Sequence, residues 1–283
     1  MTIINNSLAY SGETLVYNNE CELLWPDYID PCNPLNLPPN TVRVRTNDGA
    51  APNKISNTSY ETATLVEGTT DVYDVYKSGT DFSFLLFNSN NVEEVLGANT
   101  TGITNMYAML NYCTSLTNVA LFDTSSVTDM RIMFVFCHLL TSVPLFNTSS
   151  VTNMQSMFSK CSALTSVPLF NTSSVTNMLS MFDKCSALTS VPLFNTSSVT
   201  TMEYMFSDCS ALKMVPLFNT SSVVFMNGMF ENCTNVQSGA LALYQQVSTQ
   251  ANPPSKHTGT FKNCGSGTTT GAAELAQIPD DWK

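Results

Sequence analysis

The sequence contains little charge. Only 12% of its 283 residues are Asp, Glu, Lys or Arg, about half the usual share. The net charge is nevertheless −11 at pH 7, because acidic residues outnumber basic ones. Such a surface repels phosphate backbones and anionic lipid headgroups, so we expect binding neither to nucleic acid nor to a membrane surface. The 43% of hydrophobic residues is still enough to form a core.

Long apolar runs are absent. No segment reaches the roughly 18 apolar residues of a membrane-spanning helix, so we expect no membrane insertion. The opening sequence, MTIINNSLAYSGETLVYNNE, has neither a basic stretch nor a long apolar run, and we expect no signal peptide there. Neither end carries a lipid-attachment motif. The chain is therefore not expected to follow the usual secretory route.

Closely spaced cysteine pairs are absent as well. Zinc sites usually contain short C-x-x-C pairs, and none of the nine cysteines forms one. Six cysteines instead recur every 24 residues: Cys113, Cys137, Cys161, Cys185, Cys209 and Cys233. One row of methionines has the same period: Met106, Met130, Met154, Met178, Met202 and Met226. A fixed period of this size is the signature of a repeat solenoid.

Each 24-residue unit, or rung, predicts one helix, one strand and one turn. Met154, Met157, Phe158 and Cys161 have the i, i+3, i+4, i+7 spacing of a short helix. Residues 164–169 (LTSVPL) then alternate like a very short strand, which the proline should end. The polar NTSS sequence that follows predicts a turn. A single rung cannot bury enough apolar surface to fold alone, so we predict an α/β solenoid with a short parallel strand ladder.

The flanks suggest four segments. Residues 1–40 predict an extended attachment segment, in which Cys21 and Cys32 either pair or stay free. Residues 41–90 predict a small β-rich capping module. Residues 91–236 form the six-repeat solenoid with a degenerate first rung, and residues 237–283 form a C-terminal cap with a helix near 239–247. The strands expected in the capping module are Thr41–Arg45, Asp71–Lys77 and Phe82–Phe87.

The repeat motif TSxVTxMxxMFxxC resembles that of the BspA-like leucine-rich-repeat family. This resemblance covers about residues 90–236, just over half of the chain, and recurs six times. It implies a leucine-rich-repeat-like fold and a role at a surface, since members of that family are commonly bacterial surface proteins. Similar repeats also occur in gut-phage proteins, and the flanking sequences resemble the short modules of phage-type proteins. The export signal and anchor that are usual in the surface proteins are not found here.

Periodic Cys and Met residues invite a metal or redox interpretation. Helical spacing with Phe favours the alternative, in which both residue types are core packing, and we predict no metal and no cofactor. The two histidines, His138 and His257, do not recur with any nucleophile. The carboxylates are scattered rather than paired as a glycosidase requires, so we predict that the chain is not an enzyme.

Comparison of the six rungs with one another points to a binding face. The strand and turn segments hardly change, whereas the positions beside the methionines vary, and we place these on the outer, helical side. The predicted face includes Arg131, Gln155, Asp183, Glu203, Tyr204 and Glu231. On the strand side, rows of Thr and Ser are either a hydrated surface or a contact for sugars.

Three functions remain open. The first is a non-enzymatic phage virion component that displays the solenoid toward a host surface or glycan and attaches to other virion proteins through its N-terminal segment. The second is a bacterial cell-surface adhesin. The third is an enzyme that degrades polysaccharide. A homo-oligomer is also conceivable, because strand ladders leave open ends unless both caps cover them.

Overall fold

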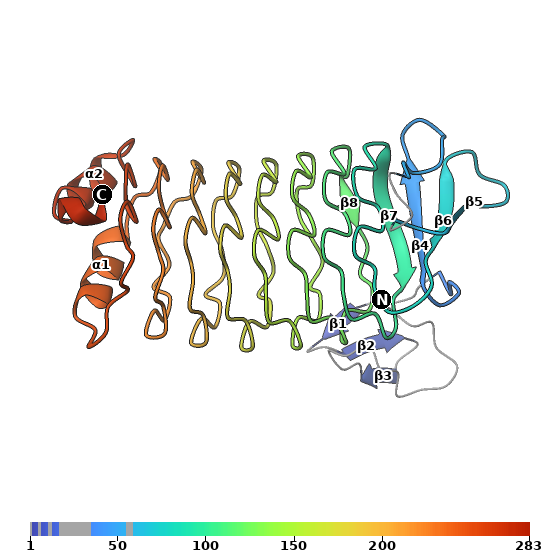
Figure 1. Ribbon diagram of the computed structural model, residues 1–283, viewed down its shortest axis with the longest axis horizontal. Coiled ribbons are helices and arrows are strands. Elements are labelled where there is room, and N and C mark those ends of the chain that lie inside the picture. The colour runs from blue at the N-terminus through green and yellow to red at the C-terminus, as the bar shows by residue number, and fades with distance from the viewer. Residues whose placement is uncertain (1, 5–6, 11–12, 17–34, 55–58) are drawn as a thin grey trace.

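The computed structural model describes residues 2–4, 7–10, 13–16, 35–54 and 59–283. The 24-residue rungs stack into a rod, with a β-sheet at its N-terminal end and helices at its C-terminal end (Figure 1). The α/β repeat solenoid is thus confirmed, although its helices lie elsewhere than predicted. Cys21 and Cys32 fall outside the described residues.

The N-terminal segment contains a small sheet of its own, where an extended segment was predicted. Strands β1 (Thr2–Ile4), β2 (Ser7–Tyr10) and β3 (Glu13–Val16) pair in antiparallel order.

A second sheet joins the capping module to the solenoid. Its five strands lie in the order β5-β6-β4-β7-β8. They are β4 (Thr41–Thr46), β5 (Thr62–Leu65), β6 (Val72–Tyr76), β7 (Val92–Asn99) and β8 (Asn118–Val119). All pairs are antiparallel except β7–β8, which is the first parallel step of the rod. The predicted strands at Thr41–Arg45 and Asp71–Lys77 are confirmed as β4 and β6.

The prediction of a third strand at Phe82–Phe87 is wrong. This segment is a run of turns whose amides donate to the rung above, for example Phe82 N to Asn105 O at 2.8 Å and Leu86 N to Met109 O at 2.9 Å. The stacked turns of the solenoid therefore begin at about Asp81, earlier than the predicted boundary. Apolar residues alone did not distinguish a short strand from a turn run.

The helix predicted in each rung is also wrong, because consecutive turns take its place. Within one rung, Met157 N donates to Met154 O at 3.2 Å and Cys161 N to Phe158 O at 3.0 Å. The amides between them point to the next rung: Ser156 N donates to Leu179 O, Phe158 N to Met181 O and Lys160 N to Asp183 O, at 2.8, 2.9 and 2.7 Å. This segment thus both turns and pairs with its neighbours, whereas an α-helix would use these donors internally.

The turn runs require left-handed backbone at two positions of each rung. In the rung of Met154 these are Ser156 (φ 53°) and Lys160 (φ 64°), and their equivalents have the same conformation in nearly every rung. Such a φ is uncommon outside Gly, Asn and Asp. Its cost is offset by the repeated hydrogen bonds between rungs, so the stack holds a conformation that an isolated rung would avoid.

The predicted strand within each rung is reduced to a few ladder contacts. Thr165 N donates to Thr141 O at 3.1 Å and Thr189 N to Thr165 O at 3.2 Å. In the described rungs that follow β8, however, this pairing does not extend into a strand. Pro168 and its equivalents follow directly and lack the N–H that would extend the pairing. Leu164 and Val167 point inward and are buried.

The core is a set of columns, each made of the side chains at equivalent positions of successive rungs. Those of Met154, Phe158, Cys161 and Val175 are fully buried, and so are their equivalents. The phenyl rings stack along the rod axis, with Phe158 and Phe182 at 5.6 Å between centroids and 6° between planes. A second Phe column, which includes Phe170, packs against this one at 6.1 Å. Each rung therefore finds its apolar partners in the rungs above and below.

The NTSS turn, as predicted, closes each rung and also links it to the next. Asn171 Oδ1 accepts from Ser173 N at 3.1 Å, which shapes the turn. The buried Thr172 hydroxyl donates to Asn195 O of the next rung at 2.7 Å. Buried threonines make the same contact from four other rungs: Thr100, Thr124, Thr148 and Thr196.

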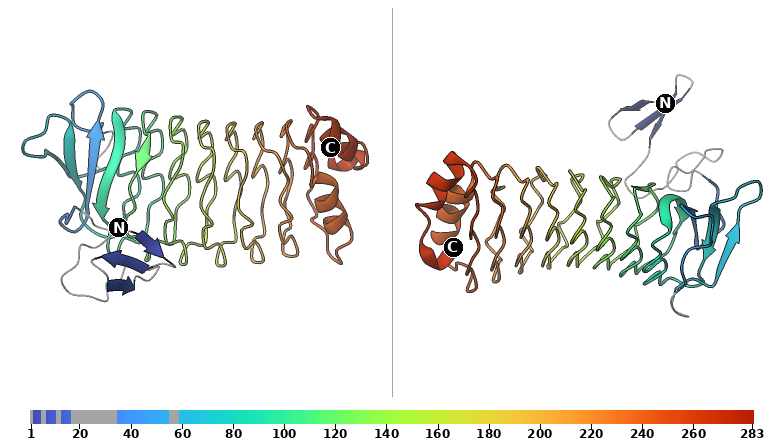
Figure 2. Two further views of the ribbon diagram at one scale, coloured as in Figure 1. Left: turned by 180° about the vertical axis from the view of Figure 1, so that it is seen from behind. Right: turned by 90° about the horizontal axis from the view of Figure 1, so that it is seen from above.

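The C-terminal cap covers the last rung with helices (Figure 2). Helix α1 (Ala240–Ser248) corresponds to the helix predicted near 239–247, while α2 (Thr269–Leu275) and the short 3-10 helix η1 (Asp280–Trp282) were not predicted. Phe261 continues the Phe column, 6.1 Å from Phe230. At Gly271 a Cβ would lie 2.2 Å from Val236 O, so only glycine lets α2 approach the rung this closely. Among the described residues, no helix is long and apolar enough to cross a membrane.

The threonine links between rungs predict unequal costs for two similar substitutions. Thr172→Val should lower the free energy of unfolding by about 1–2 kcal/mol, because it removes the hydrogen bond that the buried Thr172 hydroxyl donates to the Asn195 carbonyl of the next rung. Thr176→Val should cost less than about 0.5 kcal/mol, since Thr176 is exposed and its bond to Thr152 O is long, at 3.3 Å. Urea denaturation followed by circular dichroism measures both. Equal losses would contradict a special role for the buried hydroxyls.

Candidate functional site

The cysteine column is chemically inert packing. Each thiol is buried and donates to a backbone carbonyl of the preceding rung, as Cys161 Sγ does to Phe134 O at 3.0 Å and Cys185 Sγ to Phe158 O at 3.1 Å. The seven cysteines that the structure describes are all free thiols. Burial raises the pKa of Cys113 to about 12 and raises the pKa of Cys161 even further. A thiol this reluctant to ionise is a poor nucleophile and a poor metal ligand.

The six residues of the predicted binding face lie along the stacked turns. We call the surface that carries the side chains at positions 131, 132, 135 and 136 and at their equivalents the turn face, while the side chains at positions 133 and 134 point into the core. Gln155 and Glu203 are equivalent to Arg131, while Asp183 and Glu231 belong to another column beside it. All of these are half-buried, and Tyr204 is 43% exposed. The structure therefore brings the predicted residues onto one surface, spread over five rungs rather than gathered at a point.

Polar contacts between rungs order the C-terminal half of the turn face. Asn227 Nδ2 donates to Glu203 Oε1 at 2.6 Å and Lys262 Nζ to Glu231 Oε1 at 2.7 Å. The Tyr204 ring lies over Gly228, where a Cβ would meet it at 2.5 Å. Burial raises the pKa of Asp183 against the opposing effect of Lys184. This half of the face is acidic and held in place by its neighbours.

The N-terminal half of the turn face is aromatic, which the sequence analysis missed. Tyr112 stacks on Phe136 at 4.2 Å, and the ammonium of Lys160 lies 4.1 Å from the Phe136 ring centre. Arg131 pairs with Asp129 at 2.6 Å and lies over the Tyr107 ring at 5.0 Å. Tyr112, Phe136 and Lys160 are 24 residues apart, so the period did contain this signal.

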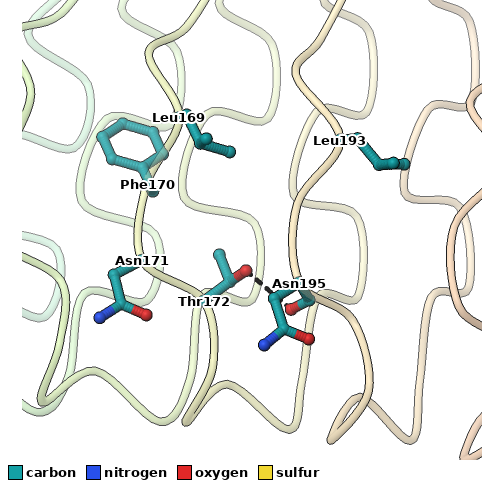
Figure 3. Close-up of a pocket in the computed structure, with 6 residues that line it drawn as sticks. All are labelled: Leu169, Phe170, Asn171, Thr172, Leu193 and Asn195. Carbon is teal, nitrogen blue, oxygen red and sulfur yellow. Dashed lines mark hydrogen bonds between the residues drawn. The ribbon is translucent and has the colours of Figure 1, made fainter.

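A second surface was missed because its residues were interpreted as strand and core. Leucines that follow the prolines of four rungs point outward, with exposed fractions of 50–62%. We call them the leucine row: Leu145, Leu169, Leu193 and Leu217. The row lies beside the exposed threonines and serines that continue from β7 and β8, and we call this side the strand face. Between Leu169 and Leu193 lies a shallow groove of about 320 Å³, also lined by Asn171 and Asn195 (Figure 3).

The repeat region matches a known family. The family is described as "Mycoplasma protein of unknown function, DUF285", and it matches residues 80–190 and 164–252, which together span more than half of the chain. The chain belongs to the DUF285 family. Its repeats are thus of the BspA-like leucine-rich type, as their motif indicated.

Two solved structures are similar to this DUF285 chain. One is a leucine-rich repeat protein of T. pallidum, with 18% identity, a TM-score of 0.44, and coverage of 66% of this chain and 80% of that one. The other is a leucine-rich repeat protein of Eubacterium ventriosum ATCC 27560, with 21% identity and a TM-score of 0.38. That match covers 68% of this chain and 44% of the other, so the chain spans less than half of that protein's length. No curated protein matches the chain.

The DUF285 chain shows no metal centre in the part that the structure describes. No three His, Cys, Asp or Glu side chains converge there as a metal site would need. His257 stacks on Trp282 at 4.1 Å within the C-terminal cap, and His138 packs edge-on against Phe136 at 5.5 Å. Both histidines thus contact aromatic rings rather than a nucleophile.

The raised thiol pKa values predict a loss of stability at alkaline pH. A thiol with a higher pKa in the folded chain than in the unfolded chain stabilises the fold below the unfolded value, and this contribution is lost as the pH rises. For Cys113 the window runs from 9.0 to about 12. Within it, each buried thiol lowers the free energy of unfolding by about 1.4 kcal/mol per pH unit. Urea denaturation between neutral and alkaline pH measures the slope.

The matched variant is Cys113→Ser, whose hydroxyl can still donate to Leu86 O but does not ionise in this window. It should reduce the pH slope by about one proton. A slope that is unchanged in this variant, or rapid maleimide labelling of the native protein at neutral pH after Cys21 and Cys32 are replaced by Ser, would contradict burial of the thiols.

Proposed function

We propose that this chain is a non-enzymatic binding protein whose turn face recognises a host-surface glycan or protein. The observation that supports this is the distribution of differences among the rungs. The interior columns and the NTSS turns repeat almost unchanged, whereas the turn face carries Arg131, Gln155, Glu203 and Tyr204 on otherwise equivalent backbone. A purely structural rod has no need for such variety on one side.

The composition of the turn face supports a binding role over a catalytic one. Its side chains are spread along the rod axis and combine aromatic, cationic and acidic groups. The carboxylates of Glu203 and Glu231 are each engaged by a neighbouring amide or ammonium group. A hydrolase acting on polysaccharide would instead need two facing carboxyl groups free to exchange protons.

We propose a phage virion as the setting, with residues 1–40 attaching the chain to other virion proteins and the solenoid displayed outward. This rests on the resemblance of the repeats and flanks to those of gut-phage proteins. The alternative is a bacterial surface adhesin of the BspA-like type. Mass spectrometry of purified virions and of host envelope fractions separates the two settings. Presence in the envelope with absence from virions would reverse the preference.

The binding role predicts a specific loss in a variant of the turn face. The triple variant Arg131→Gln, Glu203→Gln and Tyr204→Ser introduces residues that other rungs carry at the same positions, namely Gln155 and Ser156, so it should fold normally. We expect it to bind labelled host cells at least about tenfold more weakly than the parent chain. Flow cytometry of host cells titrated with the fluorescent protein measures this affinity.

The control variant changes exposed positions elsewhere and follows the same design. Thr152→Val and Ser166→Asn introduce side chains found in equivalent places at Val224 and Asn118. This variant should bind like the parent chain. Equal binding by parent and triple variant, at matched stability, would refute the turn face as the recognition surface.

A further inference from the structure

The leucine row extends beyond the four regular rungs. The half-buried Leu121 stands one rung before Leu145. One rung earlier the position is Gly97, and there the side chain of Leu35 fills the place, since a Cβ on Gly97 would lie 3.0 Å from Leu35 Cδ1. Leu35 is itself 40% exposed. The row is thus an apolar stripe of six consecutive rungs, one of them completed by a residue from outside the repeats.

The strand face around this stripe is nearly free of charge, except at its two ends. Residues 140–152, 164–176 and 188–200 contain no charged side chain, although the net charge of the chain is −11. The threonine column beside the stripe begins with Glu93 and ends with Lys213. Among the described residues, neither of these two side chains has an ion-pair or hydrogen-bond partner. The face therefore carries opposite, unpaired charges five rungs apart.

We propose that two copies of this chain form a weak dimer through the leucine row, with their rods antiparallel. The twofold axis runs perpendicular to the length of the rods and passes between the rungs of Leu145 and Leu169. Each column of one copy then faces the same column of the other copy, with the order of the rungs reversed. Leu145 of one copy then meets Leu169 of the other, and Leu121 meets Leu193. Each leucine then meets a leucine of the other copy, and the stripe is self-complementary, as a twofold interface requires, because the same column lies on both sides of the contact.

The same axis also brings together the opposite charges at the two ends of the strand face. It places Glu93 of each copy opposite Lys213 of the other, and Leu35 opposite Leu217. Asp123, at the edge of the face, lies opposite Asn195, so no like charges meet. A parallel arrangement of the rods would instead carry Glu93 to the far side of the stripe, away from Lys213. Charge complementarity therefore favours a second copy in one orientation.

The charge distribution over the rod also favours a second copy over an unrelated partner. Two chains of charge −11 repel each other over most approaches, and the turn face carries Asp183, Glu203 and Glu231. The strand face allows close contact without this repulsion. Six rungs at roughly 4.8 Å make a narrow contact, smaller than the standard ~800 Å² per partner. The dimer should therefore be weak, with a dissociation constant in the micromolar range.

Sedimentation velocity of the full chain over a wide concentration range tests the dimer, with a reductant present so that Cys21 and Cys32 cannot link copies. The parent chain should shift from monomer to dimer with increasing concentration. The double variant Leu169→Asp and Leu193→Asp should weaken the dimer at least about tenfold. The matched control is Leu139→Asp, because Leu139 is similarly exposed, at 51%, but lies outside the row. Its dimer should match that of the parent chain.

A charge swap tests the orientation and is independent of any loss of apolar contact. Glu93→Lys and Lys213→Glu should each weaken the dimer about two- to tenfold, and the double variant should restore it, because each pair is rebuilt with reversed signs. Circular dichroism and thermal melting confirm that every variant is folded. Failure of the double variant to recover would overturn the antiparallel arrangement.

A parent chain that stays monomeric at the highest concentration reached would overturn the proposal as a whole. If leucine variants of such a monomeric chain also lose binding to host cells while the turn-face triple variant retains it, the row is a ligand site instead. The proposal does not rest on the proposed function, since a dimer can form whatever the turn face binds.

Discussion

The structure depends on a division of backbone donors within the turn run of each rung. Alternate amides close turns inside the rung, and the amides between them donate to the next rung. Neither set of amides would suffice alone. Turns without a neighbouring rung would leave the other backbone donors unpaired, and a flat strand paired only with its neighbours would not direct four apolar side chains inward over eight residues. The arrangement fixes a left-handed backbone at two positions per rung, as at Ser156 and Lys160. It also explains why the period tolerates no insertion across six rungs.

This division of donors explains which features the sequence predicted and which it did not. The period, the apolar core columns and the turn at Asn171 follow from residue type and spacing, since a core needs apolar side chains in either geometry. The helix was wrong because Met154, Met157, Phe158 and Cys161 face inward in a turn run as well as in a helix. Spacing reports the direction of side chains and says nothing of where the backbone amides donate. The donor pattern and the left-handed φ angles separate the two, and residues at the left-handed positions such as Ile132 and Phe136 are not types that favour this conformation.

The surfaces were harder to predict than the core for a related reason. Leu169 is apolar and periodic, so it resembled a core residue, yet Pro168 and the following turn rotate it outward to 59% exposure. The predicted residues of the turn face do share one surface, because variation among rungs is a direct sign of a position free from packing. The aromatic stack of Tyr112 and Phe136 was missed although its column varies to Lys160 and Asp208, because residue type alone does not show that rings one rung apart stack.

The different compositions of the two faces of the rod both follow from the hydrogen bonds that stack one rung on the next. On the turn face, side chains leave a backbone that is already fixed by hydrogen bonds between rungs, so Ile, Phe, Tyr, Lys and Asp can all occupy left-handed positions there. On the strand face, the buried Thr172 hydroxyl and the Asn171 turn need the same residues in each rung, and the intervening Leu169 is repeated with them. Variety on one side and uniformity on the other are thus products of the same stacking. A varied surface suits recognition of a different molecule. A surface of repeated residues is instead matched best by another surface that has the same repeat.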